Sequence, residues 1–326
     1  MADSRHAAAL AELLPDLLTP ETPLQELWRI FYKDRLAVIG LVVLIFLLIA
    51  ALAGKVLTEW TVTFDPATVR LPDKFKPPLS SASVDLIPPA DRPLFGTYLL
   101  GTDELGRDVF ARMLQGSFVS LSIGFIAVGI SVLIGIVLGG LAGFYGTVKL
   151  GFMTVDTLIM RFTDVMLCFP TFFLILTVVA LLPPSIYNIM IVIGLTSWEG
   201  TARFVRAEFL TLREQDFVVA AQALGLPERR IIFRHMVPNA IAPVLVSATI
   251  GVASAILTES ALSFLGFGVQ PPYATWGNIL ADGKDFIFDA PWLFFIPGVA
   301  ILVVVLAFNL VGEGLREALN PKLRRR

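Results

Sequence analysis

The sequence predicts an all-α membrane protein that crosses the bilayer with six transmembrane helices. Of its 326 residues, 56% are hydrophobic and 16% are charged, whereas soluble domains carry about 25% charged residues. The mean hydropathy is +0.78, and the apolar residues lie in long uncharged runs. Runs of about 18 or more such residues are typical of helices that span a bilayer. These observations exclude a water-soluble fold as the main interpretation.

The N-terminal part of the chain predicts a cytoplasmic segment followed by a membrane anchor. Residues 1–35 are polar to amphipathic, and from Pro23 onward apolar residues recur at helical spacing with basic residues between them. This pattern predicts an interfacial helix. Residues 36–54 contain no charge and are interpreted as the first transmembrane helix. The run is longer than the hydrophobic part of a typical signal peptide, so we expect it to be retained.

Residues 55–115 are predicted to form a large extracytoplasmic loop. The segment is polar and contains the proline-rich strings LPDKFKPP and LIPPADRP. Proline lacks the amide donor of a helix and clashes with the preceding turn, so the segment cannot be one continuous helix. It separates the first span from a five-helix core in residues 116–312.

The second span, 117–144, carries a stripe of small residues. Gly135, Gly139 and Gly143 follow one another at four-residue spacing. Because glycine has no side chain, such a stripe lets another helix approach closely. We therefore expect this face of the second span to be covered by a neighbouring helix.

The third and fourth spans are irregular. The third, 165–182, follows an amphipathic stretch and is interrupted by Pro170. The fourth, 186–198, has fewer residues without charge than the roughly 20 that a perpendicular helix needs. We expect its helix to continue into the polar residues that follow.

The fifth and sixth spans, 240–265 and 292–311, complete the predicted set. The stretch 203–234 between the fourth and fifth spans holds six arginines, and the tail 313–326 is also basic. Because short basic segments stay on the cytoplasmic side, both termini and this stretch are predicted to be cytoplasmic.

No catalytic or metal-binding motif stands out in the chain. The sequence contains no GxxxxGK[ST] phosphate loop, no HExxH and no CxxC, and it has two histidines, too few for a typical zinc site. Its single cysteine, Cys168, excludes an intrachain disulfide and is interpreted as a packing residue. We therefore expect a chain that is not an enzyme, binds no cofactor, metal or nucleic acid, and takes energy for any active transport from an ion gradient or from a separate ATPase.

One ionisable residue lies within the apolar cores. Glu259 belongs to the fifth span, where a charge costs roughly 2.5–3.5 kcal/mol and should face the protein interior or water. Two interpretations stay open. Glu259 lines or gates a transport pathway, or it is a structural carboxylate that bonds to a neighbouring helix or reaches the outer interface.

The cytoplasmic stretch at about 200–238 has the residues of a compact helical turn. Ala220 and Ala221 leave a helix face without bulk, and Gly225 permits a turn that a residue with a side chain would resist. Pro227 fits the first turn of a second short helix. The sequence therefore predicts a helix–turn–helix that lies parallel to the membrane.

The same stretch resembles the EAA loop of binding-protein-dependent importer permeases. In that motif an Ala-Ala pair precedes a glycine, and a proline follows 13 residues later; the matching positions here are Ala220, Ala221, Gly225 and Pro238. The motif's glutamate is replaced by Val219, and Asp216 lies three residues earlier. The resemblance implies that this segment couples an ATPase subunit to the spans.

Further strings extend the resemblance over roughly residues 24–326. GTDELGRDVFARML, LSFLGFGVQPP, TWGNIL and the C-terminal FFIPGVAILVVVLAFNLVGEGLREALNP are similar to the second permease subunit of the dipeptide, oligopeptide and nickel branch of ABC importers. The resemblance implies the type I ABC importer permease fold and an inner-membrane location. It implies as partners a homologous permease, two ATPase subunits that hold ATP-Mg and an extracytoplasmic solute-binding protein, together with transport of peptides or, within the same family, of nickel or glutathione.

The resemblance also places a charged cluster on the outer side. Asp103, Glu104, Arg107 and Asp108 belong to the first of these strings. They either dock the solute-binding protein or form a structural network. An ion-coupled carrier is the alternative for the whole chain, and it predicts transport by this chain alone that collapses with the ion gradient.

Overall fold

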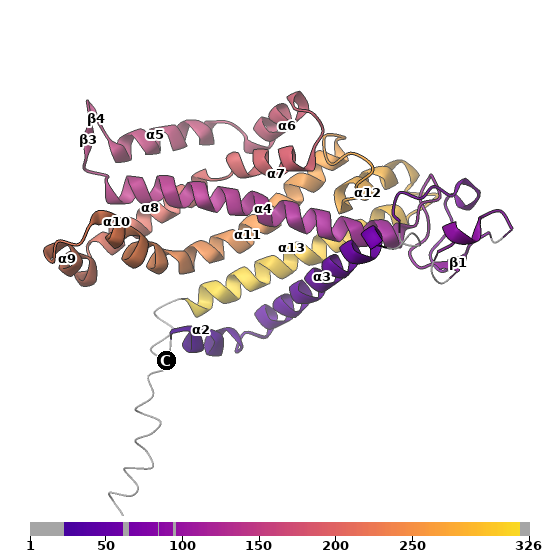
Figure 1. Ribbon diagram of the computed structural model, residues 1–326, viewed down its shortest axis with the longest axis horizontal. Helices are drawn as coiled ribbons and strands as arrows, with labels where there is room; N and C mark the ends of the chain where they lie inside the picture. Colours follow the sequence, from indigo (N-terminus) through magenta and orange to yellow (C-terminus); the bar gives the residue numbers. More distant parts are fainter. Residues whose placement is uncertain (1–22, 61–64, 84, 94–95, 320–326) are drawn as a thin grey trace, which may run out of the picture.

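The computed structural model describes residues 23–60, 65–83, 85–93 and 96–319. The protein is a bundle of long helices with a small lobe of loops at one end (Figure 1). The α-helices are α2 (Pro23–Phe31), α3 (Arg35–Trp60), α4 (Val109–Phe144), α5 (Val155–Cys168), α6 (Thr171–Leu181), α7 (Ile186–Leu195), α8 (Glu199–Arg213), α9 (Asp216–Ala223), α10 (Glu228–Arg230), α11 (Val237–Phe264), α12 (Trp276–Gly283) and α13 (Trp292–Ala318).

Short elements connect these helices. β1 (Ser80–Ser81) pairs antiparallel with β2 (Thr97–Tyr98), and β3 (Lys149–Leu150) pairs antiparallel with β4 (Met153–Thr154). The 3₁₀ turns are η2 (Leu71–Asp73), η3 (Pro89–Asp91) and η5 (Lys284–Phe286), and η4 (Ile231–Met236) is a π-helical segment.

By length and composition, four of the described helices could cross a membrane. They are α3, α4, α13 and the continuous helix Glu228–Phe264, which contains α10, η4 and α11. The pair α5 and α6 meets the same criteria only together, and α7 is a shorter apolar helix. The all-α membrane fold is therefore confirmed, and the described helices account for four or five of the six predicted spans.

The third predicted span is not one straight helix. α5 and α6 meet at a bend of 81°, and Phe169 and Pro170 between them have extended backbone conformations. Pro170 lacks an amide hydrogen and disfavours helical geometry at the residue before it. The predicted interruption is at the right residue, but the helix that precedes it begins ten residues before the predicted start, at Val155.

The continuation of the fourth span is a separate helix inside the bundle. α7 ends at Leu195 and α8 begins at Glu199, after a break at residues 196–198. α8 lies along the second half of α4, where a Cβ atom on Gly135 would come within 2.6 Å of Thr201 and one on Gly143 within 2.5 Å of Phe209. The glycine stripe is therefore covered by a close helix, as predicted. The predicted coupling loop at about 200–238 is correspondingly shorter, because its first part is this packed helix.

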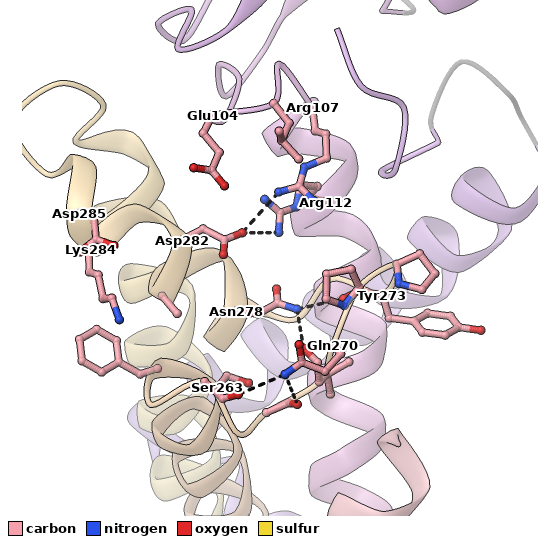
Figure 2. Close-up of a pocket in the computed structure, with 18 of the residues that line it drawn as sticks. Glu104, Arg107, Arg112, Ser263, Gln270, Tyr273, Asn278, Asp282, Lys284 and Asp285 are labelled. Atoms are coloured by element: carbon pink, nitrogen blue, oxygen red, sulfur yellow. Dashed lines mark hydrogen bonds and ion pairs between the residues drawn. The ribbon is translucent and has the colours of Figure 1, made fainter. Parts of the chain in front are cut away.

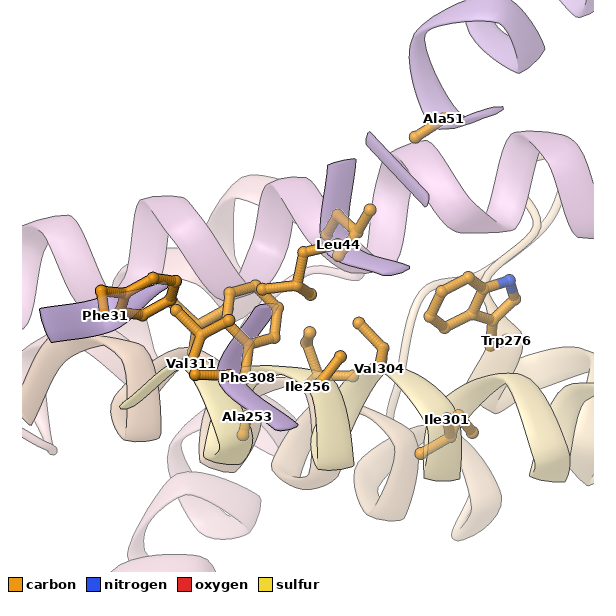
Figure 3. Packing of buried hydrophobic residues seen from close by; sticks show 14 of the residues in the cluster. Phe31, Leu44, Ala51, Ala253, Ile256, Trp276, Ile301, Val304, Phe308 and Val311 are labelled. Carbon is orange, nitrogen blue, oxygen red and sulfur yellow. The ribbon is translucent and has the colours of Figure 1, made fainter. Parts of the chain in front are cut away.

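A shared apolar core joins α3, α11, α12 and α13. Figure 3 shows Phe308 and Val304 of α13 packed beside Leu44 of α3 and Ile256 of α11, with Trp276 of α12 at one end. The opposite side of α3 is apolar and exposed, with side chains such as Ile39 and Phe46. A long exposed apolar face on a helix buried only on one side suits contact with lipid.

The lobe between α3 and α4 is organised around a buried carboxylate. Asp73 is fully buried; Tyr98 Oη donates a 2.7 Å hydrogen bond to it, and Lys76 Nζ lies 2.8 Å away. Burial alone would raise the pKa of the Asp73 carboxyl, but the hydrogen bonds from Lys76, Ser83 and Tyr98 outweigh it and lower this pKa. Because α3 continues to Trp60 and α4 begins at Val109, the loop is shorter than the predicted 55–115.

Candidate functional site

The segment predicted to couple to an ATPase lies at one end of the bundle. α9 and α10 are at the end opposite to the β1–β2 lobe (Figure 1). α9 ends at Ala223, and the chain turns at Gly225, whose φ of +70° is in the left-handed region. Leu226 N donates to Ala221 O at 3.1 Å and Gly225 N donates to Gln222 O at 2.9 Å. These bonds form a Schellman end, which requires a glycine-like conformation at this position.

The inner face of α9 is packed against the helices of the bundle. Val218 is fully buried and Ala221 is 5% exposed, and both belong to an apolar cluster with Phe209 of α8 and Met236 of η4. The small size of Ala221 therefore serves packing within the chain. α9 therefore rests on α8 and on η4, and η4 continues into the long helix Glu228–Phe264.

Two hydrogen bonds tie the ends of this segment to the end of α4. Arg213 Nη1, at the end of α8, donates to Phe144 O at 3.3 Å. Tyr145 Oη donates to Glu228 Oε2 at 2.7 Å, and this bond raises the pKa of Tyr145. The segment therefore enters and leaves beside the same turn of α4, which limits its motion relative to that helix.

The outer face of α9 is apolar and is not covered by any of the described residues. Phe217, Ala220 and Leu224 follow at spacings of three and four residues, so they lie on one side of the helix. Phe217 is 41% exposed and Leu224 is 82% exposed. Asp216 in the first turn is also exposed and makes no ion pair with any described residue. Such a narrow apolar face can enter a groove on a partner protein.

The second half of the predicted helix–turn–helix is not a separate short helix. Pro227 precedes the first turn of α10, and α10 continues through η4 into α11 as one 37-residue helix. Val237 N donates to Ile232 O, five residues earlier, and this π-type step lies directly before Pro238. Because proline cannot donate the usual amide, a wider turn at this point tolerates it. The turn is therefore joined without a break to a helix that is long and apolar enough to cross a membrane.

Glu259 lies far along α11 from this segment and is fully buried in the chain. Ser263 Oγ donates a 2.7 Å hydrogen bond to Glu259 Oε1, and Oε2 has no partner among the described residues. Glu259 lines neither of the two hollows along α11 that are described below. Burial favours the structural interpretation, and a gating role stays a prediction.

We expect Glu259→Gln to keep normal uptake and stability, because the amide oxygen can still accept from Ser263. Glu259→Leu leaves the Ser263 hydroxyl without its acceptor and should cost about 1–3 kcal/mol of stability. Uptake by cells and thermal unfolding of the purified complex measure the two effects. A loss of uptake in Glu259→Gln at normal expression would place this residue on the transport pathway instead.

At the lobe end, charged side chains form a network beside a hollow of about 490 Å³ (Figure 2). Arg112, in the first turn of α4, lies 2.6 Å from Asp103 and 2.9 Å from Asp282 of α12. Arg107 Nε lies 2.6 Å from the same oxygen of Asp103. Asp108 caps α4 by accepting from Phe110 N. The geometry supports the structural interpretation for Asp103, Arg107 and Asp108.

Two ion pairs between α5 and α8 were not foreseen from the sequence. Arg203 Nη2 lies 2.5 Å from Asp164, and Arg206 is bidentate to Asp156. Arginines three apart on one helix and aspartates eight apart on another each share a helix face, which is the signal that could have suggested the pairing. Cys168, at the end of α5, is exposed, so its interpretation as a packing residue of this chain was wrong.

Comparison with known proteins decides the family. The model of the "Binding-protein-dependent transport system inner membrane component" family matches residues 131–325. This chain belongs to that family. A second model, the N-terminal TM domain of oligopeptide transport permease C, matches residues 22–78. The chain is accordingly a multi-pass protein of the bacterial inner membrane, as predicted.

Relatives within the binding-protein-dependent family match almost the whole chain. The dipeptide transport system permease protein DppC of Haemophilus influenzae is 38% identical over 95% of this chain and 98% of that protein. The oligopeptide transport system permease protein OppC of Bacillus subtilis is 34% identical over 90% of this chain and 88% of that protein. An inward-facing structure of the MetNI methionine ABC transporter has a TM-score of 0.50 at 16% identity, over 64% of this chain and 96% of that one. That likeness concerns the fold alone.

Proposed function

We propose that this chain is a membrane-spanning permease subunit of an ATP-driven importer of dipeptides or oligopeptides. The observation that carries the proposal is α9, a short helix with an exposed apolar face that is fixed by its other face to α8 and η4. Membership of the family and the peptide-transport permeases among its relatives support the substrate class.

In this proposal α9 is the contact with an ATPase subunit. The exposed side of Phe217, Ala220 and Leu224 inserts into a groove of the ATPase, and Asp216 at the rim meets a basic group there. ATP-Mg is bound and hydrolysed by the partner, and this chain contributes no catalytic group. When the ATPases close, the displacement of α9 passes through the Gly225 turn into the helix Glu228–Phe264, and the spans change from inward-open to outward-open.

The positions of the remaining partners are proposed from the side of the membrane that each end of the bundle faces. The α9 end and the termini are proposed to be cytoplasmic, which agrees with the basic residues of the 203–234 stretch. The β1–β2 lobe then faces outward, where a solute-binding protein delivers the peptide. A homologous permease completes the pathway across the bilayer.

Purification and energy dependence test this proposal together. Affinity-tagged chain, expressed with the genes around its own, should co-purify with ATPase subunits and a second permease. In proteoliposomes with the solute-binding protein added outside, complexes whose α9 end faces the lumen should take up a labelled dipeptide only when the lumen contains ATP. Uptake by this chain alone that stops on addition of a protonophore would instead establish an ion-coupled carrier.

A further inference from the structure

A hollow of about 260 Å³ lies midway along the bundle, between α4, the α7–α8 break and α11. The described side chains that line it are small, apolar or hydroxylic, and none of them is charged. Six hydroxyl groups border it: Ser131, Ser197, Thr201, Ser247, Ser254 and Thr258. So many hydroxyls around one hollow in the centre of a membrane protein are unusual for a surface that faces lipid, where each polar group needs an internal partner.

On α11 the hydroxyls form one face. Ser247, Ser254 and Thr258 are separated by seven and four residues, which places them on the same side of the helix. Thr258 Oγ1 donates to Ser254 O at 2.8 Å, the usual bond of a helical hydroxyl to the preceding turn. The hydroxyls of Ser247 and Ser254 make no hydrogen bond to any described residue. They are free to bond to something in the hollow.

α8 contributes a further hydroxyl, that of Thr201, which makes no hydrogen bond among the described residues. Thr201 is 8% exposed, and its Cβ and Cγ2 atoms pack against the backbone of Gly135 on α4. The hydroxyl is therefore the part of the side chain left to face the hollow, and it makes no hydrogen bond within the described residues. The nearby carbonyl of Ser197 already accepts from Ser131 Oγ at 2.8 Å. A hydroxyl left unbonded in an apolar medium costs about 1–3 kcal/mol, and the Thr201 oxygen is not sealed inside the protein, so a polar molecule in the hollow can bond to it.

We infer that this hydroxyl-lined hollow is a station on the solute pathway, where hydroxyls of α8 and α11 exchange hydrogen bonds with the backbone amides of a passing peptide. The inference rests on the proposed function. Because the lining carries no charge, it binds the backbone amides that all peptides share. It does not select among peptide side chains. A second hollow shares Ser247 and Ile250 with it and extends to Arg316, near the end of α13. The two hollows therefore adjoin one another along α11.

Thiol labelling of the complete transporter tests this inference. In a Cys168→Ala background, Ser254→Cys and Ser247→Cys are introduced separately, with Phe46→Cys on the exposed face of α3 as the control. A water-soluble, positively charged methanethiosulfonate reagent should modify the two hollow positions at least about tenfold faster than Phe46→Cys. Modification should also lower ATP-dependent dipeptide uptake at least tenfold relative to the same variant before labelling, because the added group fills the path.

The outcomes separate the inference from the function on which it rests. If both hollow positions react as slowly as Phe46→Cys while the Cys168→Ala transporter still imports dipeptide with ATP, the hollow is closed by lipid or by a helix of the partner permease, and the inference fails alone. Fast labelling that leaves uptake unchanged also overturns it. If the Cys168→Ala transporter and the unaltered protein both lack ATP-dependent uptake, the proposed function itself fails.

Discussion

Gly225→Val is expected to abolish most uptake while the complex continues to hydrolyse ATP. Gly225 has a φ of +70°, and a Cβ atom built on it would meet nothing within 4 Å. The substitution therefore introduces no clash, and its cost of about 1–2 kcal/mol comes from holding an L-residue in the left-handed region. A β-branched residue resists that region most, so the turn after α9 should open and shift the helix on its cluster. We expect uptake to fall at least about tenfold, since each 1.4 kcal/mol corresponds to a factor of ten in an equilibrium.

A matched control separates this effect from a general loss of folding. Gly151, in the β3–β4 turn at the same end of the bundle, has a φ of +65° and also has nothing within 4 Å of an added Cβ. Gly151→Val therefore pays a similar backbone cost away from α9 and should leave uptake near normal. Gly225→Asn should retain most uptake, because asparagine tolerates the left-handed region. Normal uptake in Gly225→Val, or an equal loss in Gly151→Val, would contradict the placement of the coupling turn.

Arg112→Met is expected to be the most destabilising single change at the lobe end. Arg112 is 4% exposed and bridges Asp103, which is fully buried, to Asp282 of α12. Methionine keeps much of the length of the side chain but leaves Asp103 with Arg107 as its remaining ion-pair partner. Removing one member of a buried ionic network costs about 3–5 kcal/mol. We expect the midpoint of thermal unfolding of the purified complex to fall by roughly 5 °C or more.

Arg316→Met supplies the comparison for that measurement. Arg316 pairs with Glu313 at 3.5 Å, and the side chains of both residues are more than half exposed. Exposed pairs of this kind contribute about 0–1 kcal/mol, so the unfolding midpoint should scarcely change. An equal effect of the two substitutions would mean that the network around Asp103 is not a structural element, and its docking interpretation would return.

The sequence alone determined the class of fold, and it predicted a set of coupling residues whose role stays a prediction. Long uncharged runs predict membrane helices because no other local structure satisfies the backbone in lipid. The four-residue glycine spacing predicted a close helix neighbour, and Gly225 predicted a turn with a left-handed residue. Each of these signals is local: it depends on a few neighbouring residues and on the solvent around them.

The tertiary structure decided what these local signals left open. The sequence could not tell that α8 is the helix covering the glycine stripe, because polar residues such as Arg203 and Arg206 made that stretch look like a loop; their charges are balanced by aspartates on α5, about 40–50 residues away in the chain. The sequence also could not tell which of the two alanines packs within the chain and which faces outward. The packing of α9 on its cluster buries Ala221 and leaves Ala220 exposed.

Glu259 and the hydroxyl groups show that how conspicuous a residue is in the sequence does not indicate its environment in the fold. A single acidic residue in an apolar run is conspicuous in a sequence, yet folding buries Glu259 against Ser263. Scattered serines and threonines are inconspicuous, yet α4, the α7–α8 break, α8 and α11 bring six of them around one hollow. Sequence patterns record which residues are costly to place in a membrane, whereas only the packing of distant helices determines which of those groups find partners and which remain free to bind.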